Sequence, residues 1–291
     1  MATSPSHKLG QLLGNMLESI FIPLLQGVAD RHGMYLDVVG QPREGRKGKK
    51  ITWADSYGST HDLDFVFEYG GSSTQLGRPV AFIESAWRRY TKHSKNKAQE
   101  IQGAILPIAD KYYIECPFKG AILAGEFTEP SLKQLANCGF HVLYIPYSNI
   151  VSAFSQSGID MSFDESTSEV LLSQKVSAIE NISQEQLLSI KKIIIDSNRD
   201  DITTFINILE GKISKSLKKV VITPLYGNNY EFNSLSDAKN FISGYNIQHS
   251  ATENYVFNNF LIYVVYMNDD HIKAEFSSST AAINFLNAVI V

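Results

Sequence analysis

The order of apolar and polar residues predicts a pair of strands in the first third of the chain. Residues 61–68 (HDLDFVFE) alternate between apolar and mostly acidic positions, which is the period of a strand with one buried face. Turn-forming residues follow, and residues 80–87 (VAFIESAW) are rich in β-favouring side chains. The pattern therefore predicts two strands joined by a hairpin, the first carrying Asp64 and the second carrying Glu84.

A helix is predicted directly after the second strand. Residues 94–110 begin with Ser94, a favoured N-cap residue, and continue with apolar residues at helical spacing. The first turn of this helix is basic. Positive charge is therefore expected next to the strand that carries Glu84.

Apolar periodicity on both sides of this hairpin completes one domain. It predicts a helix over residues 8–32, strands within 34–40 and 51–58, and a strand, helix and strand over 119–147. A strand–helix–strand crossover of this kind extends a mixed sheet. The expected class is α/β, in a domain of residues 1–150.

The composition changes beyond this domain. Residues 151–216 combine an acidic loop with helical patterns and predict a helical arm or linker. Residues 217–291 contain a repeat with an offset of 44 residues, from Glu231 to Glu275. Each copy predicts a strand, turn, strand and helix, with Ser236 or its equivalent as the helix N-cap. Two such ββα units are expected to form one small α+β domain.

Composition narrows the class of protein. Of the 291 residues, 44% are hydrophobic and 19% are charged, as in soluble globular proteins. The longest clean apolar run, 260–267, is too short to cross a bilayer, and the start of the chain lacks the pattern of a secretory signal. Cys116 and Cys138 have neither metal-ligand nor disulfide-framework spacing. We therefore expect a cytoplasmic protein without a membrane partner.

Charge is unevenly distributed along the chain. The whole chain carries −4, but residues 41–97 hold 11 Lys and Arg against 6 Asp and Glu, a net charge of +5 that leaves −9 elsewhere. Such a concentration is expected where a polyanion is drawn to one cleft. Phosphate-binding loops, dinucleotide fingerprints and the common hydrolase motifs are absent from the sequence.

The acid pair is therefore the strongest chemical signal. Carboxylates on adjacent strands can share a hard cation such as Mg²⁺, which takes oxygen ligands and keeps water molecules for chemistry. Glu18, beside the apolar stripe of the first predicted helix, is a further candidate ligand. The alternative interpretation is that these are ordinary solvated acids.

The surroundings of the acid pair resemble the PD-(D/E)XK superfamily of restriction-endonuclease-like nucleases. In that family one strand carries a metal-binding Asp, a hairpin follows, the next strand carries Glu-x-Lys, and a helix packs behind. Asp64 matches the Asp and Glu84 the Glu, but Ala86 stands where the family has Lys. The resemblance covers roughly residues 8–147 and implies an αβββαβ core with a mixed sheet.

The resemblance also implies an activity: Mg²⁺-dependent hydrolysis of double-stranded DNA, most simply by a type II restriction enzyme. Asp64, Glu84 and the main-chain carbonyl of Ser85 would hold the metal. Cutting both strands of a near-symmetric site is simplest for a homodimer. The alternatives are another repair or defence nuclease of this fold, and a catalytically inactive DNA-binding or interaction module, which Ala86 favours.

The missing lysine requires a substitute if the site is active. Lys97, in the first turn of the helix, is the first candidate because a long lysine stem can reach toward the strand. Lys92, in the preceding loop, is the second candidate. Glu100 lies three residues beyond Lys97, on the same helix face, at a spacing where relatives supply an acid.

Cations around the hairpin are candidates for DNA contacts. The loop at 41–50 is expected to be an exposed, mobile hairpin tip, with a solubilising loop as the alternative to a phosphate-binding one. The candidates are Arg43, Arg46, Lys47, Lys49, Lys50, Arg88, Arg89 and Lys95.

Overall fold

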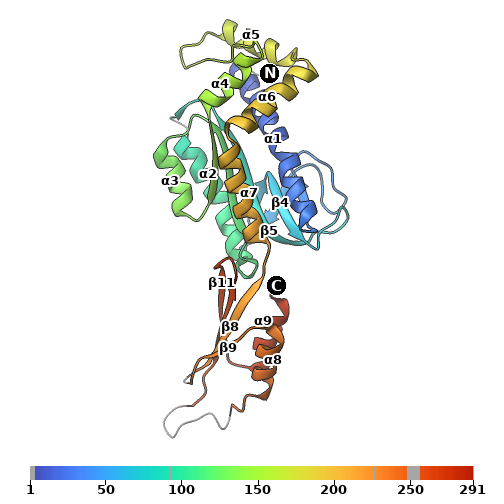
Figure 1. Cartoon of the computed structure of the whole chain (residues 1–291), viewed down its shortest axis with the longest axis vertical. Helices are drawn as coiled ribbons and strands as arrows, with labels where there is room; N and C mark the ends of the chain where they lie inside the picture. Colours follow the sequence, from blue (N-terminus) through green and yellow to red (C-terminus); the bar gives the residue numbers. More distant parts are fainter. Residues whose placement is uncertain (1–3, 92–93, 226, 248–255, 291) are drawn as a thin grey trace. The chain divides into compact units, whose positions relative to one another are not determined.

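The chain forms two compact units (Figure 1). The computed structural model describes residues 4–91, 94–225, 227–247 and 256–290. The first unit comprises Met1–Lys111 and Phe118–Glu210, and the second comprises Tyr112–Pro117 and Gly211–Val291. The helices expected as an arm or linker over 151–216 belong, up to Glu210, to the first unit. There the helix Glu169–Glu180 contacts the helix Pro5–Arg31, and Gln184–Ser197 contacts Tyr147–Gln156.

A five-stranded mixed sheet is the centre of the first unit. Its order is β1-β4-β5-β6-β7, formed by Tyr35–Val38, Phe65–Tyr69, Arg78–Arg88, Phe118–Gly125 and His141–Pro146. Strands β1, β4 and β5 are antiparallel neighbours, whereas β5, β6 and β7 run parallel. The prediction of a mixed sheet in an α/β chain is confirmed.

Several helices pack against this sheet, and others pack against those helices. They are α1 (Pro5–Arg31), α2 (Ser94–Lys111), α3 (Glu129–Asn137), α4 (Tyr147–Gln156), α5 (Glu169–Glu180), α6 (Gln184–Ser197) and α7 (Arg199–Ile213). Among the described residues, α1 alone is long and apolar enough to cross a membrane by length and composition. Nine of its side chains are buried, and it packs against β1 and β5. The apolar face of α1 therefore forms part of the core of this unit.

The predicted strand over 61–68 is wrong as one element, because the chain bends at Asp64. Its first part, β3 (Thr60–Leu63), pairs with β2 (Ile51–Ala54) in a separate two-stranded sheet. Strand β4 then pairs with β1 on one side and β5 on the other. Both faces of β4 are buried, since Val66 and Glu68 are as inaccessible to solvent as Phe67. The alternating pattern predicts only one buried face.

The prediction of an exposed loop between β1 and β2 is wrong for Arg43 and Arg46. The Arg43 side chain is 1% exposed; its Nη1 lies 2.9 Å from Asp37 Oδ2 and 2.5 Å from Glu68 Oε1. Arg46 Nε lies 2.9 Å from the same Asp37 oxygen. Two buried carboxylates explain why these cations are buried, since charge enters a protein interior only when paired. Three cations of the loop remain exposed: Lys47, Lys49 and Lys50.

The second unit contains the predicted duplication. Its antiparallel sheet has the order β11-β10-β8-β9. The first copy is β8 (Leu217–Pro224), β9 (Tyr230–Phe232) and α8 (Leu235–Gly244), and the second is β10 (Phe260–Tyr266), β11 (His271–Phe276) and α9 (Ser279–Ala288). Both helices pack on one face of the sheet (Figure 1).

The two copies begin their helices in the same way. Ser234 caps α8 by accepting a hydrogen bond from the Asp237 N–H, and Ser278 caps α9 by accepting one from the Ala281 N–H. The caps have φ and ψ of −138° and 151° in the first copy and −134° and 145° in the second. The expected cap, Ser236, is wrong by two residues and lies inside α8.

Loss of the buried guanidinium should destabilise the first unit. We expect Arg43→Met to lower the free energy of unfolding by about 3–5 kcal/mol, because it leaves Asp37 and Glu68 buried with less positive charge. Urea denaturation followed by circular dichroism measures the change, with Lys47→Met as the exposed control from the same loop. A free energy equal to that of the Lys47→Met protein would contradict this assignment.

Candidate functional site

Strand register brings the two predicted acids together. Phe65 of β4 pairs with Ile83 of β5 in antiparallel register, so Asp64, at the bend before β4, lies opposite Glu84. The Ser85 N–H donates to Asp64 Oδ2 at an N···O distance of 2.8 Å, and the Asp64 N–H donates to the Glu84 carboxylate. Main-chain N–H groups thus hold both carboxyl groups at one end of the β4–β5 strand pair.

Lys97 only partly stabilises the ionised forms of Asp64 and Glu84. Burial, and then the charge of Asp64, raise the pKa of Glu84 to about 8, although Lys97 opposes the shift. Burial also raises the pKa of Asp64, against the opposing effects of the Ser85 N–H and Lys97. Burial, followed by Asp64, raises the pKa of Glu18 on α1. Three acids from three elements therefore influence one another electrostatically.

One oxygen of this cluster lacks a partner. Glu84 is 7% exposed, and its Oε1 is buried without a hydrogen bond. A buried carboxylate oxygen in that state is costly unless a cation or donor reaches it. The described part of the chain gathers no group of three His, Cys, Asp or Glu side chains able to hold a metal ion. Two carboxylates, a main-chain carbonyl and water nevertheless suit Mg²⁺, which usually retains several water ligands.

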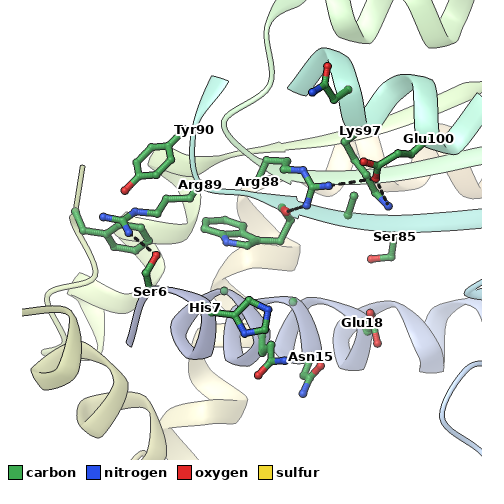
Figure 2. A pocket seen from close by; sticks show the side chains of 17 residues that line it. Ser6, His7, Asn15, Glu18, Ser85, Arg88, Arg89, Tyr90, Lys97 and Glu100 are labelled. Carbon is green, nitrogen blue, oxygen red and sulfur yellow. Dashed lines mark hydrogen bonds and ion pairs between the residues drawn. The ribbon is translucent and has the colours of Figure 1, made fainter. Parts of the chain in front are cut away.

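A cleft of about 700 Å³ opens beside these acids. Its walls are one face of α1, the end of β5 and the first turn of α2, with Phe163 contributed by the loop before α5. Figure 2 shows Glu18 and Ser85 on opposite walls, one on α1 and the other on β5. The carboxylate pair therefore lies at the margin of a space large enough for a small-molecule-sized ligand.

Two cations converge on one carboxylate above the strand. Lys97 Nζ and Arg88 Nη2 each lie 3.5 Å from Glu100 Oε2 (Figure 2). Lys97 is also close enough to act on the pKa of Asp64 and Glu84. Ala86 has only a methyl group at the sequence position where the PD-(D/E)XK motif has its lysine. The Lys97 ammonium group therefore lines the cleft and acts electrostatically on the acid pair.

The other predicted cations differ in position. Arg89 lines the cleft; its Nη1 donates to Ser6 Oγ at 2.9 Å and its Nη2 donates to the Asp164 carbonyl at 2.5 Å. Lys95 is exposed in the first turn of α2. Lys92 lies outside the described residues. The exposed lysines of the 41–50 loop are not among the residues that line the cleft.

Sequence reasoning identified Glu18 but missed the rest of the α1 wall of the cleft. His7, Gln11 and Asn15 face it at intervals of four residues, followed by Glu18. A polar stripe of this period on an otherwise apolar helix is a readable signal. Phe163 could not be predicted, because the long acidic loop that carries it has no periodicity.

Stability should depend on pH through Glu84. Its pKa is raised in the folded protein, so its contribution to stability is fully present below the unfolded pKa near 4.5 and is lost as pH rises through about 8. Without divalent cations, we expect Glu84→Gln to become progressively more stable than the wild type between pH 5 and pH 8, by a few kcal/mol at about 1.4 kcal/mol per pKa unit. Urea denaturation across this range measures the difference, which a pH-independent result would contradict.

Comparison with known proteins gives little guidance. No protein-family model and no curated protein sequence matches the chain. One solved structure, titled "Crystal Structure of Protein of Unknown Function AF1548", aligns with 62% of this chain and 96% of its own, at 11% identity and a TM-score of 0.26.

Proposed function

We propose that the chain is a Mg²⁺-dependent endonuclease that hydrolyses phosphodiester bonds of double-stranded DNA. The observation that carries the proposal is the unpartnered buried oxygen of Glu84 beside Asp64. Burial, and for Glu84 also the charge of Asp64, disfavours the ionised form of this pair, and a divalent cation bound there would stabilise that form. The cleft alongside is lined by three cations, Arg88, Arg89 and Lys97, as binding of a phosphate backbone requires.

The order of elements supports the family assignment within this proposal. Helix α1, strands β1, β4 and β5, helix α2 and strand β6 follow one another, with the β2–β3 hairpin inserted. Strand β6 runs parallel to β5. This order agrees with the αβββαβ sequence that the restriction-endonuclease-like resemblance implies and so supports the proposal, with Asp64 directly before the second core strand and Glu84 in the third.

Each group has a distinct task in the proposed reaction. Asp64, Glu84 and the Ser85 carbonyl would hold Mg²⁺, which when bound polarises the scissile phosphate and activates water for attack. The Lys97 ammonium donates a hydrogen bond to that water and offsets charge that develops on the phosphate. Glu100 holds Lys97 and Arg88 on the same side of the cleft.

Loss of either acid should abolish cleavage. We expect Asp64→Asn and Glu84→Gln each to stop Mg²⁺-dependent cutting of plasmid DNA, and to remove the rise in melting temperature that Mg²⁺ gives the wild type. Asp62→Asn is the matched control, since Asp62 lies two residues away, is exposed and pairs with Lys50. Cleavage by both site variants at the wild-type rate would refute the site.

Lys97 should act on the chemical step. We expect Lys97→Ala to lower the single-turnover cleavage rate by about a hundredfold to a thousandfold, the usual cost of removing one charge-stabilising donor, with DNA affinity nearly unchanged. Lys95→Ala, an exposed neighbour in the same turn, is the control. If Lys92→Ala instead gives the rate loss, the catalytic role belongs to Lys92.

The plasmid cleavage assay also distinguishes a restriction enzyme from the two alternative functions. Discrete plasmid fragments indicate the site specificity of a restriction enzyme, whereas random fragments indicate another nuclease of this fold. DNA binding without Mg²⁺-dependent cleavage by the wild type indicates an inactive module, the interpretation that Ala86 favours.

A further inference from the structure

Most of the cleft is not used by the acid pair. It extends from Glu18 and Lys97, beside the proposed metal site, to Arg89 and Phe163. Its volume of about 700 Å³ is within the range of pockets that enclose ligands the size of a nucleotide. The groups that line this extension indicate what it binds.

The α1 wall presents polar side chains over open space. His7, Gln11 and Asn15 line the cleft together with Gly10 and Gly14. A Cβ added at Gly14 would meet no atom within 4 Å, and one at Gly10 would meet only Trp87 Cδ1, at 3.9 Å. Amide side chains offer a donor and an acceptor side by side, the arrangement that pairs with base edges. This wall therefore combines free space with groups that can hydrogen-bond a base.

The opposite wall supplies aromatic rings and cations. Trp87 of β5, Tyr90 just beyond the end of β5, and Phe163 line it. The Arg89 guanidinium lies 4.4 Å from the Tyr90 ring centroid and 4.7 Å from that of Phe163. The Nε atoms of Arg88 and Arg89 are buried without hydrogen bonds. Aromatic surfaces stack bases, and nearby arginines attract the phosphates that connect them.

The concave form of the site determines which form of DNA fits. Intact duplex is recognised by elements that project into its grooves. A recess admits a nucleotide only after the base has left the helical stack. Here the recess adjoins the carboxylate site, so its occupant would be a nucleotide next to the reacting phosphate.

We propose that this cleft is a binding subsite for one unpaired nucleotide base, extruded from the duplex beside the scissile bond. Gln11 and Asn15 hydrogen-bond its edge, and Trp87 provides the aromatic contact. The part of this inference that places the base beside a scissile bond rests on the proposed nuclease function. Base binding itself can be measured without cleavage.

Gly14 permits a selective block of the subsite. Gly14→Leu adds a side chain on the wall of the cleft at a position where a Cβ meets no atom within 4 Å, and leucine is a better helix former than glycine. Gly103→Leu is the matched control, because Gly103 is an exposed glycine of α2 with nothing within 4 Å of an added Cβ and does not line the cleft. Gly14→Ala serves as a smaller second variant, and circular dichroism checks the fold of each.

Trp87 provides the readout. The chain has two tryptophans, so Trp53→Phe, which retains an aromatic ring against Phe82, leaves Trp87 as the single fluorophore. In EDTA, this protein is titrated with a single-stranded thymidine pentamer and with a pentamer of abasic residues that has the same charge. We expect the thymidine pentamer to quench Trp87 and to bind about tenfold or more tightly than the abasic one, the effect of one stacked base.

Gly14→Leu, in this single-tryptophan background, should reduce binding of the thymidine pentamer to the abasic level, and Gly103→Leu should leave it unchanged. Equal affinity for the two pentamers would overturn the proposal, as would undiminished base binding by Gly14→Leu. Plasmid cleavage by the wild type, measured separately with Mg²⁺, tests the nuclease. Cleavage without base discrimination overturns the subsite alone, and base discrimination without cleavage overturns the nuclease alone.

Discussion

The register between β4 and β5 is the constraint on which the candidate site depends. A slip of one residue would turn Asp64 or Glu84 to the other face. Arg43 fixes the hairpin end of this pair, because its guanidinium donates to the carbonyls of Ser72 and Gln75 in the connecting loop while it pairs with Glu68. The register shifts between Phe67 and Glu68, so the buried ion cluster anchors the hairpin end of the strands, while the pairing of Phe65 with Ile83 places the acids at the other end.

The sequence was informative where local pattern and local structure agree. The hairpin acids, the basic start of α2 and the duplicated C-terminal units were readable, because each depends on short-range periodicity, capping or repetition. The β1–β4 pairing was not readable, since the strands are separated by a hairpin that forms its own small sheet. The burial of Arg43 and Arg46 also depends on distant acids, so a run of cations in a glycine-rich loop gave the wrong exposure.

The first unit contains two groups of buried carboxylates, and they differ in whether a cation pairs with them. The carboxylates of Asp37 and Glu68 are matched by arginine and stabilise the folded chain through hydrogen bonds from fixed guanidinium groups. Glu84 is also buried but has no such partner at Oε1. The second cluster is therefore incomplete, and the raised pKa of Glu84 means that ionising this side chain lowers the stability of the folded chain.

The duplicated unit has a consequence of its own. Strands β8 and β10, the first strands of the two copies, pair at the centre of the sheet, and β9 and β11 flank them. The copies are thus joined in the manner of two subunits, yet they are encoded separately within one polypeptide. Each half can acquire its own side chains by independent mutation, so the surfaces of the two halves can diverge while the sheet keeps its nearly symmetric form, whereas in two identical subunits every mutation appears twice.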